Sequence, residues 1–234
     1  MKKLDKVLIS IVVSLVVIGV VVGIFTRFSY KDNVSFSRIS NNIDDYKIVV
    51  GDVDSDRAFY KSFYVENIKS LSDLELESDY ILKVRAEDDR KTLNNTLYTK
   101  VNVVKIYKGN DLKGKNYIYI YEPCFFDVYN KTFYSQWGYN FMHSNDEYIV
   151  FLRKIKAPQG YHYKNNEGIS FLFTSLPYGK YKLKDTGEVI AVDEKKIDQG
   201  LKYGDVKDLD IITSDSTVAN RYESIKNEVL RKYK

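Results

Sequence analysis

Apolar and polar residues alternate most regularly over residues 96–122, where the pattern predicts a β-hairpin. In its first half, Val104 and Ile106 shift the apolar positions by one residue, as a β-bulge does in a strand that curls. In its second half, Ile118 and Ile120 alternate with tyrosines, so one face can be buried while the other stays amphipathic. These tyrosines are Tyr117, Tyr119 and Tyr121. We therefore expect a mainly β domain organised around this hairpin.

Other segments with strand patterns flank the hairpin. Alternation over 78–87 predicts the strand before it, and residues 88–95 are interpreted as a charged turn. The apolar run 148–152, bounded by turn residues, predicts a buried strand after it. Shorter strands are predicted at 46–50, 169–173, 181–183 and 189–192, the last two joined by a hairpin turn at 185–187.

Two segments carry helix signals. Ser70 or Ser72 can cap a short helical turn that leads into the strand at 78–87. Near the C-terminus, Ser214 or Asp215 can cap a helix that runs to about Lys232. Its apolar residues recur at helical spacing, so we expect this amphipathic helix to dock on the sheet. They are Val218, Tyr222, Ile225 and Val229.

The N-terminal apolar run, Val7 to Phe25, is uncharged and long enough to cross a bilayer as a helix. Three lysines precede it, which predicts a cytoplasmic N-terminus and an extracytoplasmic remainder. A cleaved signal peptide is the alternative, but the run is long and ends without a small-x-small cleavage site. We divide the chain into a cytoplasmic tail (1–6), a signal-anchor (7–25), a linker (26–45), an extracytoplasmic β domain (46–213) and a C-terminal helix (214–234).

Composition narrows the function classes. The 234 residues are 44% hydrophobic, which can supply a real core. Without Lys2, Lys3, Lys6 and Asp5 the net charge falls from +4 to +2, since three positive charges and one negative charge are removed. A nucleic-acid-binding protein normally carries a larger and more clustered excess, so we expect no nucleic-acid partner. The chain's single cysteine excludes an internal disulfide and a cysteine-cluster metal site.

Residues 123–142 are crowded with aromatic side chains and show little regular period. One interpretation is a long excursion that packs its rings over an open end of the sheet. The other is a ligand-binding aromatic patch for a glycan or an envelope protein. The residues of this candidate patch are Tyr129, Phe133, Tyr134, Trp137 and Tyr139.

Motifs for catalysis and metal binding are few. Asp52, Asp54 and Asp56 resemble the start of a calcium loop, but Arg57 replaces the glycine and Phe63 replaces the bidentate glutamate. An acidic turn is the alternative.

The glycines at 109 and 114 have P-loop spacing in a strand-to-strand context, which favours a simple turn. Cys124 and His143 are the one nucleophile–base pair worth testing, as the site of an envelope enzyme. We expect no cofactor and no catalytic site, and a purely structural envelope role is a further alternative.

Four short motifs in sequence order resemble a group of bacterial extracytoplasmic proteins. They are Ser78-Asp-Tyr-Ile-Leu82, Val103-Val-Lys-Ile-Tyr-Lys-Gly109, Tyr117-Ile-Tyr-Ile120 and Asp146-Glu-Tyr-Ile-Val-Phe-Leu152. The domain of that group is similar to the OB-like barrel of tissue inhibitors of metalloproteinases. The resemblance covers about Ser70 to Leu183 and implies an OB-like antiparallel barrel. Those inhibitors chelate zinc through an amino-terminal cysteine that this chain lacks, so it implies no such inhibition.

Overall fold

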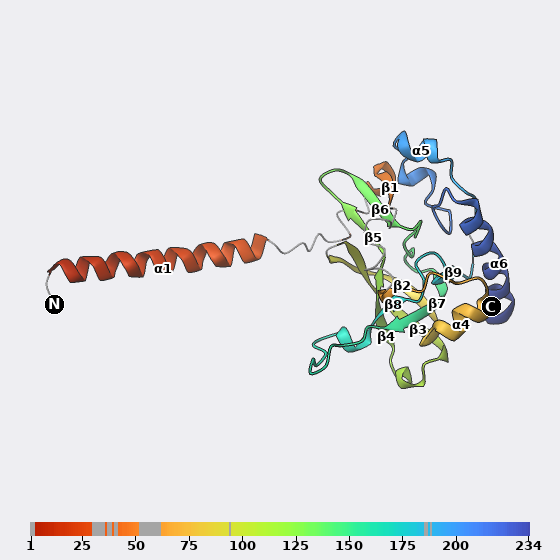
Figure 1. The fold of residues 1–234 in the computed structure, drawn as a ribbon, viewed down its shortest axis with the longest axis horizontal. Helices are drawn as coiled ribbons and strands as arrows, with labels where there is room; N and C mark the ends of the chain where they lie inside the picture. Colours follow the sequence, from red (N-terminus) through yellow and green to blue (C-terminus); the bar gives the residue numbers. More distant parts are fainter. Residues whose placement is uncertain are drawn as a thin grey trace. The chain divides into compact units, whose positions relative to one another are not determined.

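The structure, a computed structural model, describes residues 3–29, 36, 39, 42–51, 62–93, 95–184, 187 and 189–234 (Figure 1). The chain divides into two compact units, residues 1–33 and residues 34–234.

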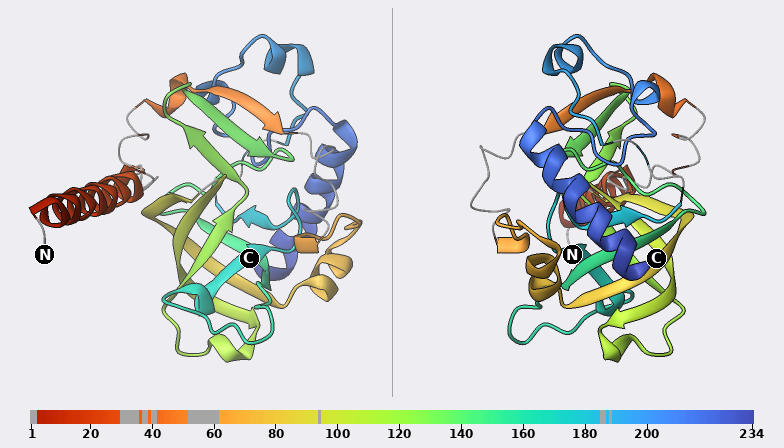
Figure 2. Two further views of the ribbon diagram at one scale, coloured as in Figure 1. Left: turned by 60° about the vertical axis from the view of Figure 1, so that its left-hand side comes forward. Right: turned by 90° about the vertical axis from the view of Figure 1, so that its right-hand side faces the viewer.

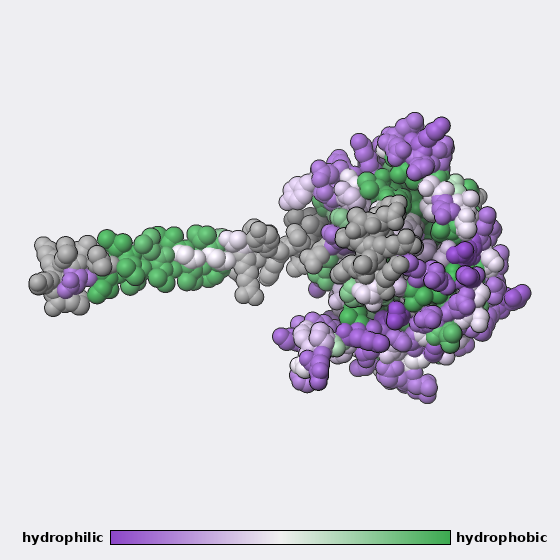
Figure 3. Space-filling view, viewed as in Figure 1, coloured by the Kyte–Doolittle hydropathy of each residue, from purple (hydrophilic) through white to green (hydrophobic). Residues whose placement is uncertain are grey.

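The first unit contains helix α1 (Lys3–Ser29). Its surface is hydrophobic along most of its length (Figure 3), and every side chain described from Ile9 to Thr26 is exposed. By length and composition this helix can cross a membrane, which confirms the predicted apolar helix.

The second unit contains a large six-stranded sheet. Its strands are β2 (Tyr80–Leu93), β3 (Thr96–Lys108), β4 (Tyr117–Glu122), β7 (Glu147–Lys154), β8 (Ser170–Phe173) and β9 (Lys180–Lys182). They lie in the order β2-β3-β4-β8-β7-β9, and β2 also pairs with β7. All these pairs are antiparallel except β4–β8, which is parallel. The predicted β-rich domain is therefore confirmed, whereas a wholly antiparallel arrangement is wrong.

The predicted central hairpin is confirmed as β3 and β4. Ile118 and Ile120 are completely buried, and the alternating tyrosines face the other side. The predicted bulge is present because Lys83 pairs with Lys105 while Val84 pairs with Val103, which leaves Val104 as an extra residue. Val104 is 46% exposed, so the bulge turns this apolar side chain away from the core.

Strand β2 is longer than predicted. The segment 88–95, interpreted above as a charged turn, continues the strand as far as Leu93. A register shift lies between Ala86 and Arg90, after which Arg90 points inward and is 4% exposed. The prediction fails because Arg90 is a buried charge, with its guanidinium 3.9 Å from the carboxylate of Glu122.

A second sheet joins the strand predicted at 46–50 to two strands of the aromatic excursion that the sequence analysis did not predict. Its strands are β1 (Lys47–Gly51), β5 (Cys124–Asp127) and β6 (Thr132–Gln136), in the order β1-β6-β5. β5 and β6 form an antiparallel hairpin, while β1 and β6 are parallel. The carboxylate of Asp127 stabilises the connecting turn by accepting hydrogen bonds from the backbone N–H groups of Tyr129 and Asn130. Figure 2 shows this sheet next to the large one within the same unit.

Both predicted helices are present, as α4 (Leu71–Glu77) and α6 (Ser216–Tyr233). Ser70 and Asp73 form a reciprocal capping box on α4, and the carboxylate of Asp215 caps α6. Helix α6 lies across the strands of the large sheet (Figure 2, right). Other helical elements in the described part of the chain are α5 (Glu194–Asp198) and the 3-10 turns η1 (Ile43–Asp45), η3 (Asn110–Leu112), η4 (Glu167–Ile169) and η5 (Tyr203–Asp205).

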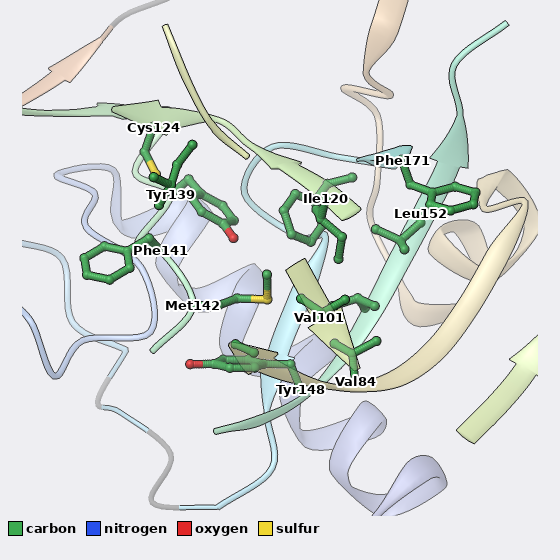
Figure 4. Close-up of a cluster of buried hydrophobic side chains, with 14 of the residues drawn as sticks. Val84, Val101, Ile120, Cys124, Tyr139, Phe141, Met142, Tyr148, Leu152 and Phe171 are labelled. Atoms are coloured by element: carbon green, nitrogen blue, oxygen red, sulfur yellow. The ribbon is translucent and has the colours of Figure 1, made fainter. Parts of the chain in front are cut away.

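Two hydrophobic clusters form the core. The larger one joins the inner faces of both sheets, and Figure 4 shows part of it around Val101, Ile120 and Met142. The smaller one lies under α6 and α4, with Tyr222, Ile225 and Val229 packed against the large sheet as predicted.

Residues from the segment 26–45, predicted as a linker, contribute to the larger cluster. Ile39 is completely buried, and the ring of Phe36 makes an edge contact with that of Phe141 at 5.8 Å between centroids.

The predicted hairpin between 181–183 and 189–192 is wrong among the residues described here. Tyr181 pairs instead with Ile149 of β7. Ala191 makes an isolated bridge to Thr213 in place of the predicted strand.

Candidate functional site

The five residues of the predicted aromatic patch do not gather on one surface. Phe133 and Tyr139 are 0% and 2% exposed and belong to the core, so neither can stack on a ligand. Tyr129 is 97% exposed at the tip of the β5–β6 turn. Phe133 points inward because alternate side chains of strand β6 face opposite sides, and Tyr139, which follows that strand, is held in the core by its hydrogen bond to Glu122.

The other two predicted residues are partly buried in separate places. The ring of Tyr134 stacks on that of Phe125, with centroids 4.6 Å apart and an interplanar angle of 8°. Trp137 has a φ of 51° after the end of β6, and its buried indole N–H has no hydrogen-bond acceptor among the residues described. These contacts place Tyr134 on the outer face of the small sheet and Trp137 at its edge.

Cys124 and His143, the pair considered for catalysis, occupy different environments. The thiol of Cys124 is buried in the larger core cluster, and this burial raises its pKa well above the ordinary value. A neutral buried thiol is a poor nucleophile. Burial lowers the pKa of His143 to about 4, and its Nε2 lies 3.2 Å from the hydroxyl of Tyr203. The described contacts therefore join His143 to Tyr203 and do not join it to Cys124.

The predicted calcium ligands Asp52, Asp54 and Asp56 lie outside the described residues. Within the described part of the chain, no group of three or more His, Cys, Asp or Glu side chains could hold a metal ion.

A different aromatic surface is present on the outer face of β3 and β4 and in the loop that follows β7. We name it the tyrosine surface. It consists of Tyr98, Tyr117, Tyr119, Tyr121, Tyr161 and Tyr163. The loop between β7 and β8 projects next to β4 and appears teal in Figure 1. Three of these side chains, Tyr117, Tyr161 and Tyr163, are 39%, 43% and 39% exposed.

Ring contacts make the tyrosine surface continuous. The ring of Tyr98 stacks on that of Tyr119 at 4.7 Å with an interplanar angle of 4°, and it contacts the ring of Tyr121 at 4.8 Å. Tyr121 shares a hollow of about 220 Å³ with Tyr161 and Tyr163. The rings are thus linked from the middle of the sheet to the loop.

Hydrogen bonds fix the orientation of several rings on this surface. The hydroxyls of Tyr98 and Ser170 lie 2.8 Å apart, and the hydroxyl of Tyr161 donates to Glu167 at 2.7 Å. The hydroxyl of Tyr163 donates to the carbonyl of Ile155. Burial raises the pKa of Tyr98 to about 12, so this side chain stays neutral at physiological pH. These hydrogen bonds therefore preorganise the rings of Tyr98, Tyr161 and Tyr163.

The sequence pattern identifies three of the six residues of the tyrosine surface, those on β4. The alternation of Tyr117, Tyr119 and Tyr121 with buried isoleucines places them on the outer face of β4. Tyr161 and Tyr163 lie in a loop without a period, so no sequence pattern connects them to β4.

Comparison with known protein families and curated proteins identified no relative of this chain. No protein-family model matches the sequence, and no curated protein matches it.

Proposed function

We propose that this chain is a single-pass membrane protein whose β domain lies outside the cytoplasm and binds a protein partner of the cell envelope without catalysing a reaction. The observation that carries the proposal is the tyrosine surface, whose six neighbouring rings lie on the outer face of β3 and β4 and in the loop after β7. Tyrosine is enriched in protein interfaces because its rigid ring buries a large area while its hydroxyl stays compatible with water.

The fold of the binding module is proposed to be an OB-like barrel. The pairings β2–β3, β3–β4, β4–β8, β8–β7 and β7–β2 form a ring of five strands. This ring, with its single parallel pair, supports a small closed barrel of the kind that binds ligands on an outer face. β9 extends the sheet beyond the ring by pairing with β7.

The packing of the rings favours a protein over a glycan as the partner. A sugar ring stacks on an open aromatic face, but Tyr98 and Tyr119 cover each other's faces. The ammonium of Lys100 lies 4.9 Å from the centre of the Tyr117 ring and covers part of that face. The tyrosine surface therefore presents mainly ring edges and hydroxyl groups. Such groups suit contact with a flat protein surface.

The charge around α1 supports the proposed orientation. Lys2, Lys3 and Lys6 precede the apolar run, and short positively charged flanks remain in the cytoplasm. Alkaline phosphatase fused after residue 234 should be active in bacteria, because this reporter folds only outside the cytoplasm. The intact mass of the chain, measured in the membrane extract and in the medium, decides between a retained anchor and a secreted product, since signal cleavage would remove the apolar run and release the rest.

Site-specific photo-crosslinking tests the partner contact. A photoreactive phenylalanine analogue replaces Tyr117 in the full chain, in the cells that naturally produce the protein. A second variant carries the analogue at Tyr129, which is even more exposed but lies on the distant β5–β6 turn. We expect one discrete cross-linked protein from position 117 and none from position 129.

Charge insertion provides the specificity control. Tyr119→Glu, placed in the variant with the analogue at 117, should abolish the cross-linked product because a carboxylate would be desolvated in the contact. The same product from positions 117 and 129, or its persistence with Tyr119→Glu, refutes the proposed surface. Binding to a glycan array that Tyr119→Glu removes, without any protein product, would replace the protein partner by a glycan.

A further inference from the structure

A cavity of about 470 Å³ lies beside the β7–β9 edge of the large sheet, away from the tyrosine surface. Its wall combines Tyr148 from β7, Lys180 and Lys182 from β9, and the segments 140–143 and 207–210. Tyr148 and Lys180 are diagonal neighbours on adjacent strands, because Tyr148 pairs with Lys182 and Val150 pairs with Lys180. Their side chains therefore emerge on the same face of the sheet.

Lys180 is the unusual residue of this cavity. It is only 7% exposed, and its ammonium lies 5.0 Å and 5.4 Å from the ring centres of Tyr139 and Tyr148. Figure 4 shows both rings within the larger core cluster. Across the described ranges, no carboxylate lies within ion-pair distance of Lys180 Nζ and no acceptor forms a hydrogen bond with it. Burying an ammonium in this way is costly unless an acceptor reaches it.

The other lysines in the cavity wall, Lys182 and Lys207, and Lys226 beside the wall residue Asp210, already have counterions. The ammonium of Lys182 lies 2.7 Å from Asp146, that of Lys207 lies 2.8 Å from Asp44, and that of Lys226 lies 2.7 Å from Asp210. Lys180 is thus the cavity lysine that is left without a carboxylate in the described structure.

The hydroxyl of Tyr148 supplies a second donor. Its oxygen accepts a hydrogen bond from the backbone N–H of His143 at 2.8 Å. Its own proton has no acceptor among the residues that the structure describes. Tyr148 and Lys180 therefore present an O–H and an N–H donor on the same face of the sheet.

The neighbouring polar side chains are already satisfied. Asn140 donates to the carbonyls of Lys207 and Leu209, at 3.1 and 2.7 Å, and accepts from the hydroxyl of Tyr203 at 3.0 Å. Because that hydroxyl donates to Asn140, it must accept from Nε2–H of His143. A neutral imidazole with this tautomer adds no positive charge to the cavity.

We propose that this cavity binds a small organic ligand through a carboxylate, with one oxygen accepting from Lys180 Nζ and the other from the Tyr148 hydroxyl. This site is separate from the tyrosine surface and does not depend on the proposed partner. A single negative charge fits best, because Lys180 is the one cavity lysine without a carboxylate in the described structure, and Asp208 in the wall repels a dianion such as a phosphate monoester more strongly than a monoanion. The cavity volume leaves room for an organic group beyond the carboxylate.

Benzoate is the probe and benzamide is its neutral control of nearly the same shape. Titration into the full-length chain in a mild detergent, followed by calorimetry, should give saturable binding of benzoate and none of benzamide. Lys180→Met should weaken benzoate binding by at least about tenfold, because it removes the charge-assisted bond. Tyr148→Phe should weaken it by about threefold to tenfold. Lys232→Met, which changes a paired lysine outside the cavity, should bind as the wild type does.

Thermal unfolding separates a ligand-binding lysine from a structural one. Lys180→Met should unfold at the same temperature as the wild type or higher, because an unpaired buried charge is replaced by an apolar chain of similar length. The proposal is overturned if the wild type does not bind benzoate, if Lys180→Met binds it equally well, or if benzamide binds equally well. It is also overturned if Lys180→Met lowers the unfolding temperature, since that result assigns Lys180 a structural role.

Discussion

Replacing Glu122 by glutamine tests the buried polar cluster at the end of β4. The carboxylate of Glu122 accepts hydrogen bonds from the hydroxyls of Thr99 and Tyr139 and from the backbone N–H of Met142. The guanidinium of Arg90 lies 3.9 Å away, and neither charged side chain is exposed. Glu122 thus connects the large sheet to the segment that follows the small one.

The size of the effect follows from these contacts. Glutamine keeps the shape of glutamate, but one of its two terminal groups is an NH2 that cannot accept a hydrogen bond. At least one of the three donors loses its acceptor, and Arg90 keeps a buried charge without a counterion. The Coulomb attraction at 3.9 Å is about 4 kcal/mol at an effective dielectric constant of about 20. We expect Glu122→Gln to lower the free energy of unfolding by about 3–5 kcal/mol.

Equilibrium unfolding in urea measures this loss, with the full-length chain in a mild detergent. Trp137 is the single tryptophan and therefore reports unfolding by fluorescence without labelling. Glu147→Gln is the matched control, because Glu147 pairs with Lys83 at 2.8 Å and Arg85 at 2.7 Å near the protein surface. That control should lose about 1 kcal/mol or less.

A double-mutant cycle isolates the ion pair from the hydrogen bonds. Arg90→Met combined with Glu122→Gln should be less destabilised than the sum of the two single variants, since no unpaired charge remains. The reasoning is refuted if Glu122→Gln loses no more stability than Glu147→Gln. Additive losses in the double variant would show that the two charges do not interact.

Three further predictions concern a histidine, a turn and a helix cap. Burial lowers the pKa of His143 from 6.5 to about 4, so stability should be fully present above pH 6.5 and fall by about 3 kcal/mol as the pH drops through 4. His143→Gln should flatten the profile of urea midpoint against pH, and an unchanged profile would contradict this. Gly109→Ala should cost more than about 2 kcal/mol, because φ is +105° and a Cβ would lie 2.2 Å from a tyrosine ring carbon. Gly114→Ala, at φ +84° in open space, should cost about 1 kcal/mol, and equal losses would argue against the clash. Asp215→Ala should cost about 1 kcal/mol in urea unfolding and Ser214→Ala almost nothing, whereas the reverse order would assign the cap to Ser214.

Local periodicity predicts the elements that bury one face and expose the other. The β3–β4 hairpin and α6 are of this kind, and even the bulge at Val104 is visible as a one-residue shift in the pattern. β2 escapes prediction beyond residue 87 because its inward residue Arg90 is charged and the compensating Glu122 is distant in sequence. A pattern of residue types cannot reveal a pairing between such distant positions.

The candidate sites are harder to predict from the sequence than the fold is. In Lys180-Tyr181-Lys182 a lysine stands on either side of a tyrosine, and lysines are mostly exposed in proteins. Lys180 is nevertheless 7% exposed, because α6 covers one face of β9 and the core covers the other. The parallel pairing of β1 with β6 likewise joins segments about 85 residues apart without any local signal.

The position of α6 has a consequence for how the protein is made. This helix supplies Tyr222, Ile225, Val229 and Tyr233 to the smaller core cluster, and the last turn is bonded to the rest through Tyr107. During synthesis or export, strands β2, β7 and β9 emerge before α6, so the part of their apolar face that this helix covers is exposed at first. Until α6 docks, this exposed apolar face makes the incomplete domain prone to aggregation.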